Sequence, residues 1–260
     1  KPYAKGLLED NSGCIPFICF EAGPIGRLRA MEQPSPYLIG GKVDLNKYSS
    51  TMAYQVIVHQ VQTVPEGTDL SCLLPSGHID LEKYQEEFHT FVGRIHDEAL
   101  RKLVEAMFAG ETWKRFIRNP AGMRLHHAYV GGLLHHTVCV TRLAVAMCGA
   151  IGNVDQDLVI AGALLHDIGK LREISADLGF PYTTEGRLMG HISIGAMAVD
   201  RMARRIPELP AAKREQLLHI ILSHHGDQEK GSPVVCATRE AFIVHYADEV
   251  DSIMNQFHEK

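Results

Sequence analysis

The stretch Leu165-His-Asp-Ile-Gly-Lys170 is the strongest indication of the fold of the C-terminal part of the chain. The longest clean apolar run of the chain, Leu158 to Leu165, ends here. Directly after it come the imidazole of His166 and the carboxylate of Asp167. A buried carboxylate such as Asp167 is costly unless a partner compensates its charge, and metal coordination is one way to do so. The stretch therefore predicts a pair of metal ligands near the C-terminal end of a buried helix.

Further histidines and a second aspartate stand in similar apolar surroundings on either side. They occur in Gly131-Gly-Leu-Leu-His-His136, Gly190-His191, Ser223-His-His-Gly226 and His245-Tyr-Ala-Asp248. Neutral imidazole and carboxylate are ligands of first-row divalent metals, and such metals mostly activate water or polarise a phosphoryl group. A single histidine on an apolar face is more often a hydrogen-bonded core residue. The recurrence on five helices favours a metal site over a purely structural polar network.

The residues by themselves leave two choices open. Adjacent positions on a helix lie about 100° apart, so His135 and His136 cannot both point inward. A mixed imidazole and carboxylate set also accepts several metals, and occupancy follows availability as much as affinity. The sequence therefore predicts one or two divalent ions without fixing their identity.

Two regions of different character make up the chain. Residues 1–64 are β-rich, with strands expected at 2–9, 15–21, 37–45 and 52–64 and with gaps rich in Pro and Gly at 23–26 and 34–41. Residues 65–80 are predicted to be a linker. Residues 81–260 show helical spacing and are expected to form an all-α bundle. Its helices are expected at 82–96, 98–108, 112–118, 125–149, 157–172, 191–205, 211–224 and 238–258, with a loop at 175–190.

Composition limits the class of protein. With 260 residues, 45% hydrophobic and 22% charged, the chain is ordinary globular material. The net charge of -5 gives no general basic footprint for nucleic acid. One modest basic cluster is formed by Lys114, Arg115, Arg118 and Arg124.

Six scattered cysteines without a C-x-x-C pair indicate reduced thiols. We expect a cytoplasmic protein with no membrane segment, since the apolar run 158–165 is too short to span a bilayer and no signal peptide is evident.

The order His, His-Asp, His, His, Asp on successive helices resembles the HD superfamily of metal-dependent phosphohydrolases. Four stretches resemble, more closely, the YhaM-type 3′→5′ exoribonucleases. They are Met123-Arg-Leu-His-His-Ala-Tyr-Val-Gly-Gly-Leu-Leu-His-His-Thr137, Ala161-Gly-Ala-Leu-Leu-His-Asp-Ile-Gly-Lys170, Gly186-Arg-Leu-Met-Gly-His-Ile-Ser193 and Leu222-Ser-His-His-Gly226. The resemblance implies an OB-like β domain at 1–64 before an HD domain at 81–260. Because an OB barrel has five strands and we count four, its first strand is expected to be absent.

The resemblance also implies which residues hold metal. The first ion is expected on His136, His166, Asp167 and Asp248, which chooses His136 over His135. A second ion would share Asp167 and take His191 and His224. Manganese is favoured, with Fe, Co, Ni, Zn and Mg as alternatives.

Several other side chains are candidates for catalysis or substrate binding. Asp167 and Lys170 are the predicted catalytic residues. Lys170, one turn beyond His166, could contribute positive charge to the phosphoryl group, or it could be a solvated residue at a helix C-terminus. Candidates to contact the scissile phosphate or protonate the leaving group are Arg124, His126, His127 and His225. The segment 182–184 is either a substrate wall or an ordinary loop. Asp251 either orients a metal ligand or is solvated.

Three hypotheses for function follow. The leading one is a metal-dependent exoribonuclease that degrades single-stranded RNA, and DNA as a further substrate, from the 3′ end to 5′-mononucleotides. The alternative is an HD phosphohydrolase of nucleotides or cyclic nucleotides, which the lack of a basic balance favours. The third is a catalytically silent RNA-binding module, against which the complete ligand set argues and which would bind no metal. Self-association of the chain is a further expectation.

Overall fold

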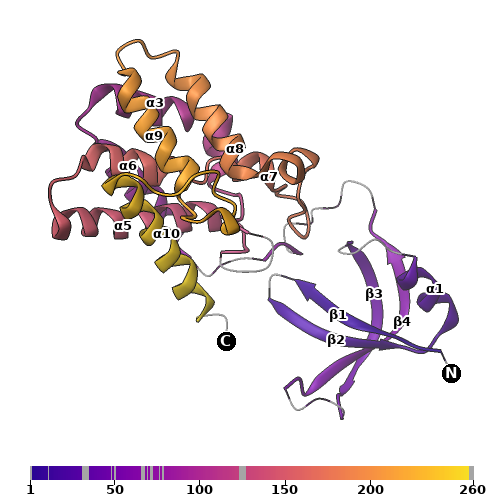
Figure 1. Ribbon diagram of the computed structural model, residues 1–260. Helices are drawn as coiled ribbons and strands as arrows, with labels where there is room; N and C mark the ends of the chain where they lie inside the picture. Colours follow the sequence, from indigo (N-terminus) through magenta and orange to yellow (C-terminus); the bar gives the residue numbers. More distant parts are fainter. Residues whose placement is uncertain are drawn as a thin grey trace. The chain divides into compact units, whose positions relative to one another are not determined.

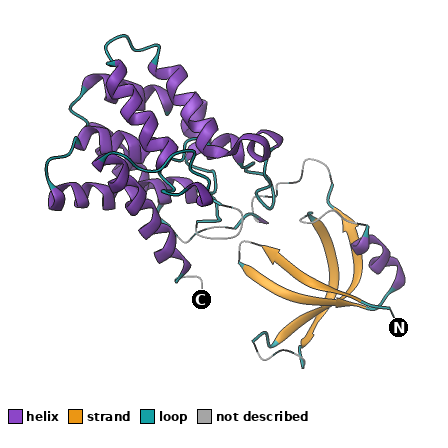
Figure 2. Ribbon diagram, viewed as in Figure 1, coloured by secondary structure: helices purple, strands orange, loops and turns teal. Residues whose placement is uncertain are grey.

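The computed structural model describes residues 2–257 apart from 11, 31–34, 48, 50, 66–67, 69, 71–72, 76, 78 and 123–126. The chain divides into two compact units, one of residues 1–76 with 177–179 and one of residues 77–176 with 180–260. The first unit holds the sheet and the second is helical (Figure 2). A small β domain followed by a helical domain is therefore confirmed. The division at 76/77 lies inside the stretch predicted as a linker.

The β unit is a four-stranded curved sheet (Figure 1). Its strands are β1 (Ala4–Asp10), β2 (Gly13–Cys19), β3 (Tyr37–Leu45) and β4 (Tyr54–Thr63), in the order β1-β2-β4-β3. β1 pairs with β2 and β3 with β4 in antiparallel fashion, whereas β2 and β4 are parallel. Each strand lies within two residues of the bounds predicted for it. A small core of Phe17, Cys19, Val58 and Val61 lies on one face of the sheet.

One helix of the β unit was not predicted. α1 (Ala22–Arg29) occupies the stretch 23–26, which was expected to be an irregular gap. Pro24 falls in its first turn, where a missing N–H costs nothing, and Ile25 and Leu28 pack against the core of the sheet. Gly40 and Gly41 lie within β3, inside the strand predicted at 37–45, at a shift of register. At α1 the packing of Ile25 and Leu28 outweighed the tendency of Gly and Pro to break regular structure.

The helical unit is built from α2 to α10. The bounds are α2 (Leu81–Gly93), α3 (Glu98–Met107), α4 (Glu111–Phe116), α5 (Gly132–Ile151), α6 (Gln156–Leu165), α7 (Lys170–Glu173), α8 (Thr184–Ala203), α9 (Ala211–Ser223), a 3₁₀ turn η2 (Gln228–Lys230) and α10 (Arg239–Gln256). Side chains of Asp80, Asp97, Asp155, Thr183 and Thr238 accept hydrogen bonds from the first turns of α2, α3, α6, α8 and α10. These caps satisfy backbone donors that would otherwise lack partners.

One continuous apolar core joins these helices. α5 is long and apolar enough to cross a membrane by length and composition alone. Its residues Leu133, Leu134 and Val138 are completely buried in this core, however, and α5 packs against α10, α6 and α2. α5 therefore serves as a central helix of the unit and brings whatever lies on its inner face close to α6 and α10.

Three predicted helices have different bounds in the structure. α5 begins at Gly132 instead of 125, because residues 127–131 fold back onto its start. A Cβ on Gly132 would lie 1.9 Å from the carbonyl oxygen of His127, so only glycine permits this return. The helix expected at 157–172 is split into α6 and α7, and α8 begins at Thr184 within the expected loop 175–190.

Candidate metal centre

The break between α6 and α7 contains the His-Asp pair. α6 ends at Leu165, and α7 begins at Lys170. Gly169 lies against α8 so closely that a Cβ there would be 2.0 Å from the carbonyl oxygen of His191. The chain thus turns at the pair, and both side chains point into the interior, where His166 is completely buried and Asp167 is 2% exposed.

The first group of predicted ligands meets around the Nε2 atom of His136 on α5. This atom lies 3.1 Å from Asp248 Oδ1 on α10 and 3.3 Å from Asp167 Oδ2. It is also 3.2 Å from His166 Nε2. Four donors from three parts of the chain, α5, α10 and the break between α6 and α7, therefore converge, and they are the residues that the resemblance implied for a first cation.

A second group meets around the other oxygen of Asp167. Asp167 Oδ1 lies 3.4 Å from His191 Nε2 on α8 and 3.7 Å from His224 Nε2 at the end of α9. All three atoms are buried and have no hydrogen-bond partner among the described residues. Buried polar atoms are normally paired, so three unpaired ones facing each other fit a bound cation. The residues of this second group therefore suit a divalent metal.

Each of the four histidines has its ring orientation fixed by a hydrogen bond on the side away from the centre. In every case Nδ1 is engaged, which leaves Nε2 directed at the centre. The Nδ1 partners of His136, His166, His191 and His224 are Asp251 Oδ2, the carbonyl oxygen of Ala163, Glu173 and the carbonyl oxygen of Ile221, at 2.7, 2.7, 3.0 and 2.7 Å. With Nδ1 engaged in this way, Nε2 is the ring atom that each histidine can offer to a metal.

Strong electrostatic coupling marks the centre. Burial opposes ionisation of Asp167, but the Lys170 ammonium and the imidazole of His166 hold the pKa of that carboxyl well below its usual range. Burial opposes protonation of His136, but Asp167, Asp248 and Asp251 raise its pKa well above the ordinary value. Without metal, the positive charge that balances these carboxylates comes from Lys170 and from a proton on His136. A cation would take over that balancing.

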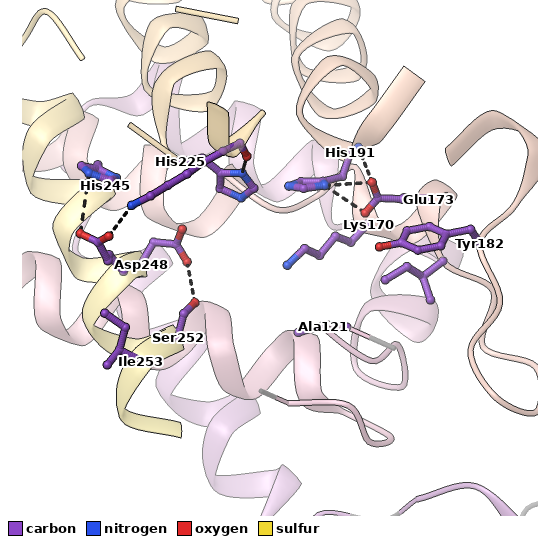
Figure 3. A pocket seen from close by; sticks show the side chains of 14 residues that line it. Ala121, Lys170, Glu173, Tyr182, His191, His225, His245, Asp248, Ser252 and Ile253 are labelled. Carbon is purple, nitrogen blue, oxygen red and sulfur yellow. Dashed lines mark hydrogen bonds and ion pairs between the residues drawn. The ribbon is translucent and has the colours of Figure 1, made fainter. Parts of the chain in front are cut away.

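Lys170 is not a solvated residue at a helix C-terminus. It is the first residue of α7, is 8% exposed, and places Nζ 2.7 Å from Asp167 Oδ2. Figure 3 shows its amine pointing into a pocket between His191 and Asp248. Although burial disfavours the charged form, the carboxylate of Asp167 raises the pKa of Lys170. The location suits a charge acting on a bound phosphoryl group.

His225 lies beside the second group. Ligand atoms of His191, His224 and His225 lie within 4.8 Å of one another. The Nδ1 atom of His225 is 2.9 Å from the carbonyl oxygen of Lys230, and burial lowers the pKa of its ring. His225 is therefore placed to act as a further ligand or as a contact to substrate, and its role in substrate binding stays a prediction.

His127 occupies a different environment from the one predicted for a substrate contact. It is 1% exposed, with Nε2 2.8 Å from Asp251 Oδ2 and Nδ1 2.9 Å from the hydroxyl of Tyr129. Asp251 therefore joins His127 to the ligand His136, and of its two predicted roles the structure favours orienting a ligand. Arg124 and His126 lie outside the described residues.

Glu173 belongs to the centre but was not singled out from the sequence. It lies at the end of α7 and binds His191 through its carboxylate. Because one continuous helix was expected over 157–172, Glu173 fell just after its end. The direction of its side chain could therefore not be predicted. Only the break after Leu165 and the packing of α7 on α8 bring it to His191.

A pocket of about 640 Å³ opens beside His191 and Asp248, one ligand from each of the two groups (Figure 3). Its lining includes Lys170, Tyr182, His191, His225, Lys230, His245, Asp248, Glu249 and Ile253. Of the predicted loop 182–184, Tyr182 alone lines the pocket, since Thr183 caps α8 and Thr184 begins it. His245 is held by a 2.8 Å hydrogen bond from Nδ1 to the carbonyl oxygen of His224.

The helical unit matches a known protein family. Residues 133–253 match the family model described as HD domain. A crystal structure of the HD domain of the phosphodiesterase PgpH from L. monocytogenes is 20% identical, with a TM-score of 0.36, and covers 56% of this chain and 74% of that one. The predicted HD domain is confirmed, and with it the predicted enzyme class, a metal-dependent phosphohydrolase.

Proposed function

We propose that this chain, with its HD domain at 133–253, is a metal-dependent 3′→5′ exoribonuclease that shortens single-stranded RNA to 5′-mononucleotides. The observation that carries the proposal is the meeting of three unpaired buried atoms, Asp167 Oδ1, His191 Nε2 and His224 Nε2, next to the group around His136. One carboxylate thus has a separate oxygen for each group. This arrangement supports a site for two cations.

Divalent cations in such a site supply activated water and neutralise charge on a phosphodiester. The chain's own residues do the rest. Asp167 is ionised and directs one oxygen to each ligand group, while Nδ1 hydrogen bonds hold the histidines in one orientation. Lys170 supplies a fixed positive charge at the pocket, where removal from water strengthens its effect on a phosphoryl oxygen. By resemblance we favour Mn, with Fe, Co, Ni, Zn and Mg as alternatives.

The pocket supports a nucleotide as the reacting unit. About 640 Å³ is within the usual range for sites that enclose a small ligand. Tyr182 and Ile253 line it and are 43% and 44% exposed, so an aromatic and an aliphatic side chain face the space beside the ligands. A base of any identity can stack on such an aromatic ring, and an exonuclease that removes every nucleotide in turn requires this tolerance.

The β unit supports a nucleic-acid substrate. Its sheet combines antiparallel pairs with one parallel pair, β2 with β4, and carries α1 between β2 and β3. These features support an OB-like arrangement, a fold that commonly binds oligonucleotides. Tyr3, Phe20 and Tyr54 are each about half exposed, at 49%, 54% and 57%, and could stack on bases.

The test uses 5′-labelled RNA with a free or a blocked 3′ end, together with single-stranded DNA, incubated with protein and Mn²⁺. We expect a ladder of shortened products from the free RNA, release of 5′-mononucleotides, and persistence of the blocked RNA. If neither RNA nor DNA shortens while free nucleotides are dephosphorylated, the proposal is wrong.

That outcome would support a second candidate, a phosphohydrolase of nucleotides or cyclic nucleotides. The net charge of -5 favours it, because a nucleic-acid enzyme usually presents a more basic surface. A pocket large enough for a single nucleotide is compatible with either substrate.

A further inference from the structure

α8 is interrupted where it delivers a ligand. Gly190 has φ 69° and ψ 152°, a conformation that is not helical and that an L side chain rarely adopts. The residue after it, His191, therefore starts a new helical segment. The first N–H groups of a helix have no acceptor within the helix and need one from outside.

Glu173 supplies that acceptor. Its Oε1 atom lies 2.9 Å from the backbone nitrogen of His191 and 3.0 Å from Nδ1 of the same residue. Its Oε2 atom lies 2.9 Å from Nδ1 as well. One carboxylate therefore caps the second segment of α8 and also binds the imidazole of its first residue, as Figure 3 shows.

The backbone around Glu173 is fixed against α8, so its carboxylate has little freedom. A Cβ on Gly186 would lie 2.4 Å from the carbonyl oxygen of Glu173, and Thr183 donates a 2.9 Å hydrogen bond to the same oxygen. Glu173 is 7% exposed.

The two ligand groups have separate carboxylate supports. Asp251 on α10 binds Nδ1 of His136, whereas Glu173 on α7 binds Nδ1 of His191. His166 and His224 are oriented by backbone carbonyl oxygens instead. A change at Glu173 therefore acts on the group around Asp167 Oδ1 and leaves the group around His136 intact.

We propose that Glu173 is the positioning residue of the second cation site, where it caps α8 at the Gly190 break and fixes the ring of His191. The inference rests on the two-cation site of the proposed function but not on its substrate. Removing such a carboxylate support typically lowers metal affinity about 10–100-fold. The loss should fall on one of two ions.

The test is a titration of metal-free protein with Mn²⁺, followed by metal analysis and by electron paramagnetic resonance. Wild-type protein should bind two ions and give the signal of a coupled Mn pair. Glu173→Ala should bind the weaker ion about 10–100-fold less tightly and give the signal of isolated Mn at the same metal concentration. Glu173→Gln keeps an oxygen that can accept from His191, so its loss should be smaller than that of Glu173→Ala.

Glu185→Gln is the matched control. Glu185 lies in the first turn of α8 and pairs with Arg172 at 2.6 Å, so this variant removes a neighbouring carboxylate without touching a ligand. It should bind both ions as the wild type does. The inference is overturned if Glu173→Ala and Glu173→Gln bind both ions with wild-type affinity, or if they lose both ions together.

The two proposals fail in different ways. Wild-type protein that holds two ions but leaves RNA intact would refute the RNA substrate and leave the role of Glu173 standing. Wild-type protein that holds a single Mn²⁺ would refute the second site and the role of Glu173 with it.

Discussion

Asp167 is the side chain on which the centre depends most. Its two oxygens face different ligand groups, and Lys170 contacts one of them. The structure brings together all six side chains that were predicted as ligands. They could be predicted because their order along the chain resembles a known pattern. Glu173 and the buried place of His127 were not foreseen, since both depend on backbone turns made by glycines in tertiary contact.

Replacing Asp167 with Asn keeps the shape of the side chain and removes its charge. We expect the variant to lose bound metal from both groups and to lose all phosphodiester hydrolysis, because one carboxylate serves both. Metal analysis and the RNA-shortening assay would measure this. Asp200→Asn is the control, since Asp200 pairs with Arg204 on the surface of α8. Normal metal content in Asp167→Asn would contradict the shared role.

Lys170→Ala should behave differently from the Asp167 variant. It removes a fixed positive charge at the pocket, which should slow hydrolysis about 100-fold, while the ligands stay in place. Single-turnover rates and metal content, measured on the same sample, would test this. A variant of Lys170 that hydrolyses RNA at the wild-type rate, or that loses its metal, would rule out the proposed role.

Metal affinity should rise with pH through the neutral range. In the metal-free protein the neighbouring carboxylates raise the pKa of His136, so that its ring keeps a proton at neutral pH. A cation bound by Nε2 must displace that proton, and protons therefore compete with metal as the pH falls. Calorimetric titration in buffers of different ionisation enthalpy should reveal proton release on binding. Equal affinity across about pH 6 to 8 would contradict the expectation.

Among the helices, the interruptions place more of the metal ligands than the regular turns do: His166 and Asp167 lie in one break, and His191 follows another. Hydrophobic spacing located α2, α3, α9 and α10 closely, and it identified the apolar stretch of α6. It could not show that the helix expected over 157–172 breaks after Leu165, or that α8 is interrupted at Gly190. Both breaks are held by contacts between α7 and α8, and such contacts leave no periodic signal in the sequence.

Gly169→Ala tests the contact between α7 and α8. Its Cβ would lie 2.0 Å from the carbonyl oxygen of His191, so we expect a loss of about 1–3 kcal/mol in the free energy of unfolding. Gly149→Ala in α5 is the matched control, because nothing lies within 4 Å of its Cβ position. That variant should gain about 0.5–1 kcal/mol. Urea unfolding of both proteins would decide, and an unchanged stability of Gly169→Ala would refute the tight packing.

In the whole molecule, a β unit precedes a helical unit that contains an HD domain. This order could be read from the switch between alternating and helical spacing near residue 80. The four strands were placed well because one face of the sheet is buried, while α1 was hidden by its Gly and Pro residues. The substrate could not be read from the residues, because its recognition depends on pocket walls that come from distant segments of the chain.

The most direct test is anomalous X-ray diffraction from crystals of the protein grown with Mn²⁺. We predict two neighbouring peaks, one within coordinating distance of His136, His166 and Asp248 and one beside His191 and His224, with Asp167 between them. Peaks elsewhere in the molecule, or none near Asp167, would contradict the account.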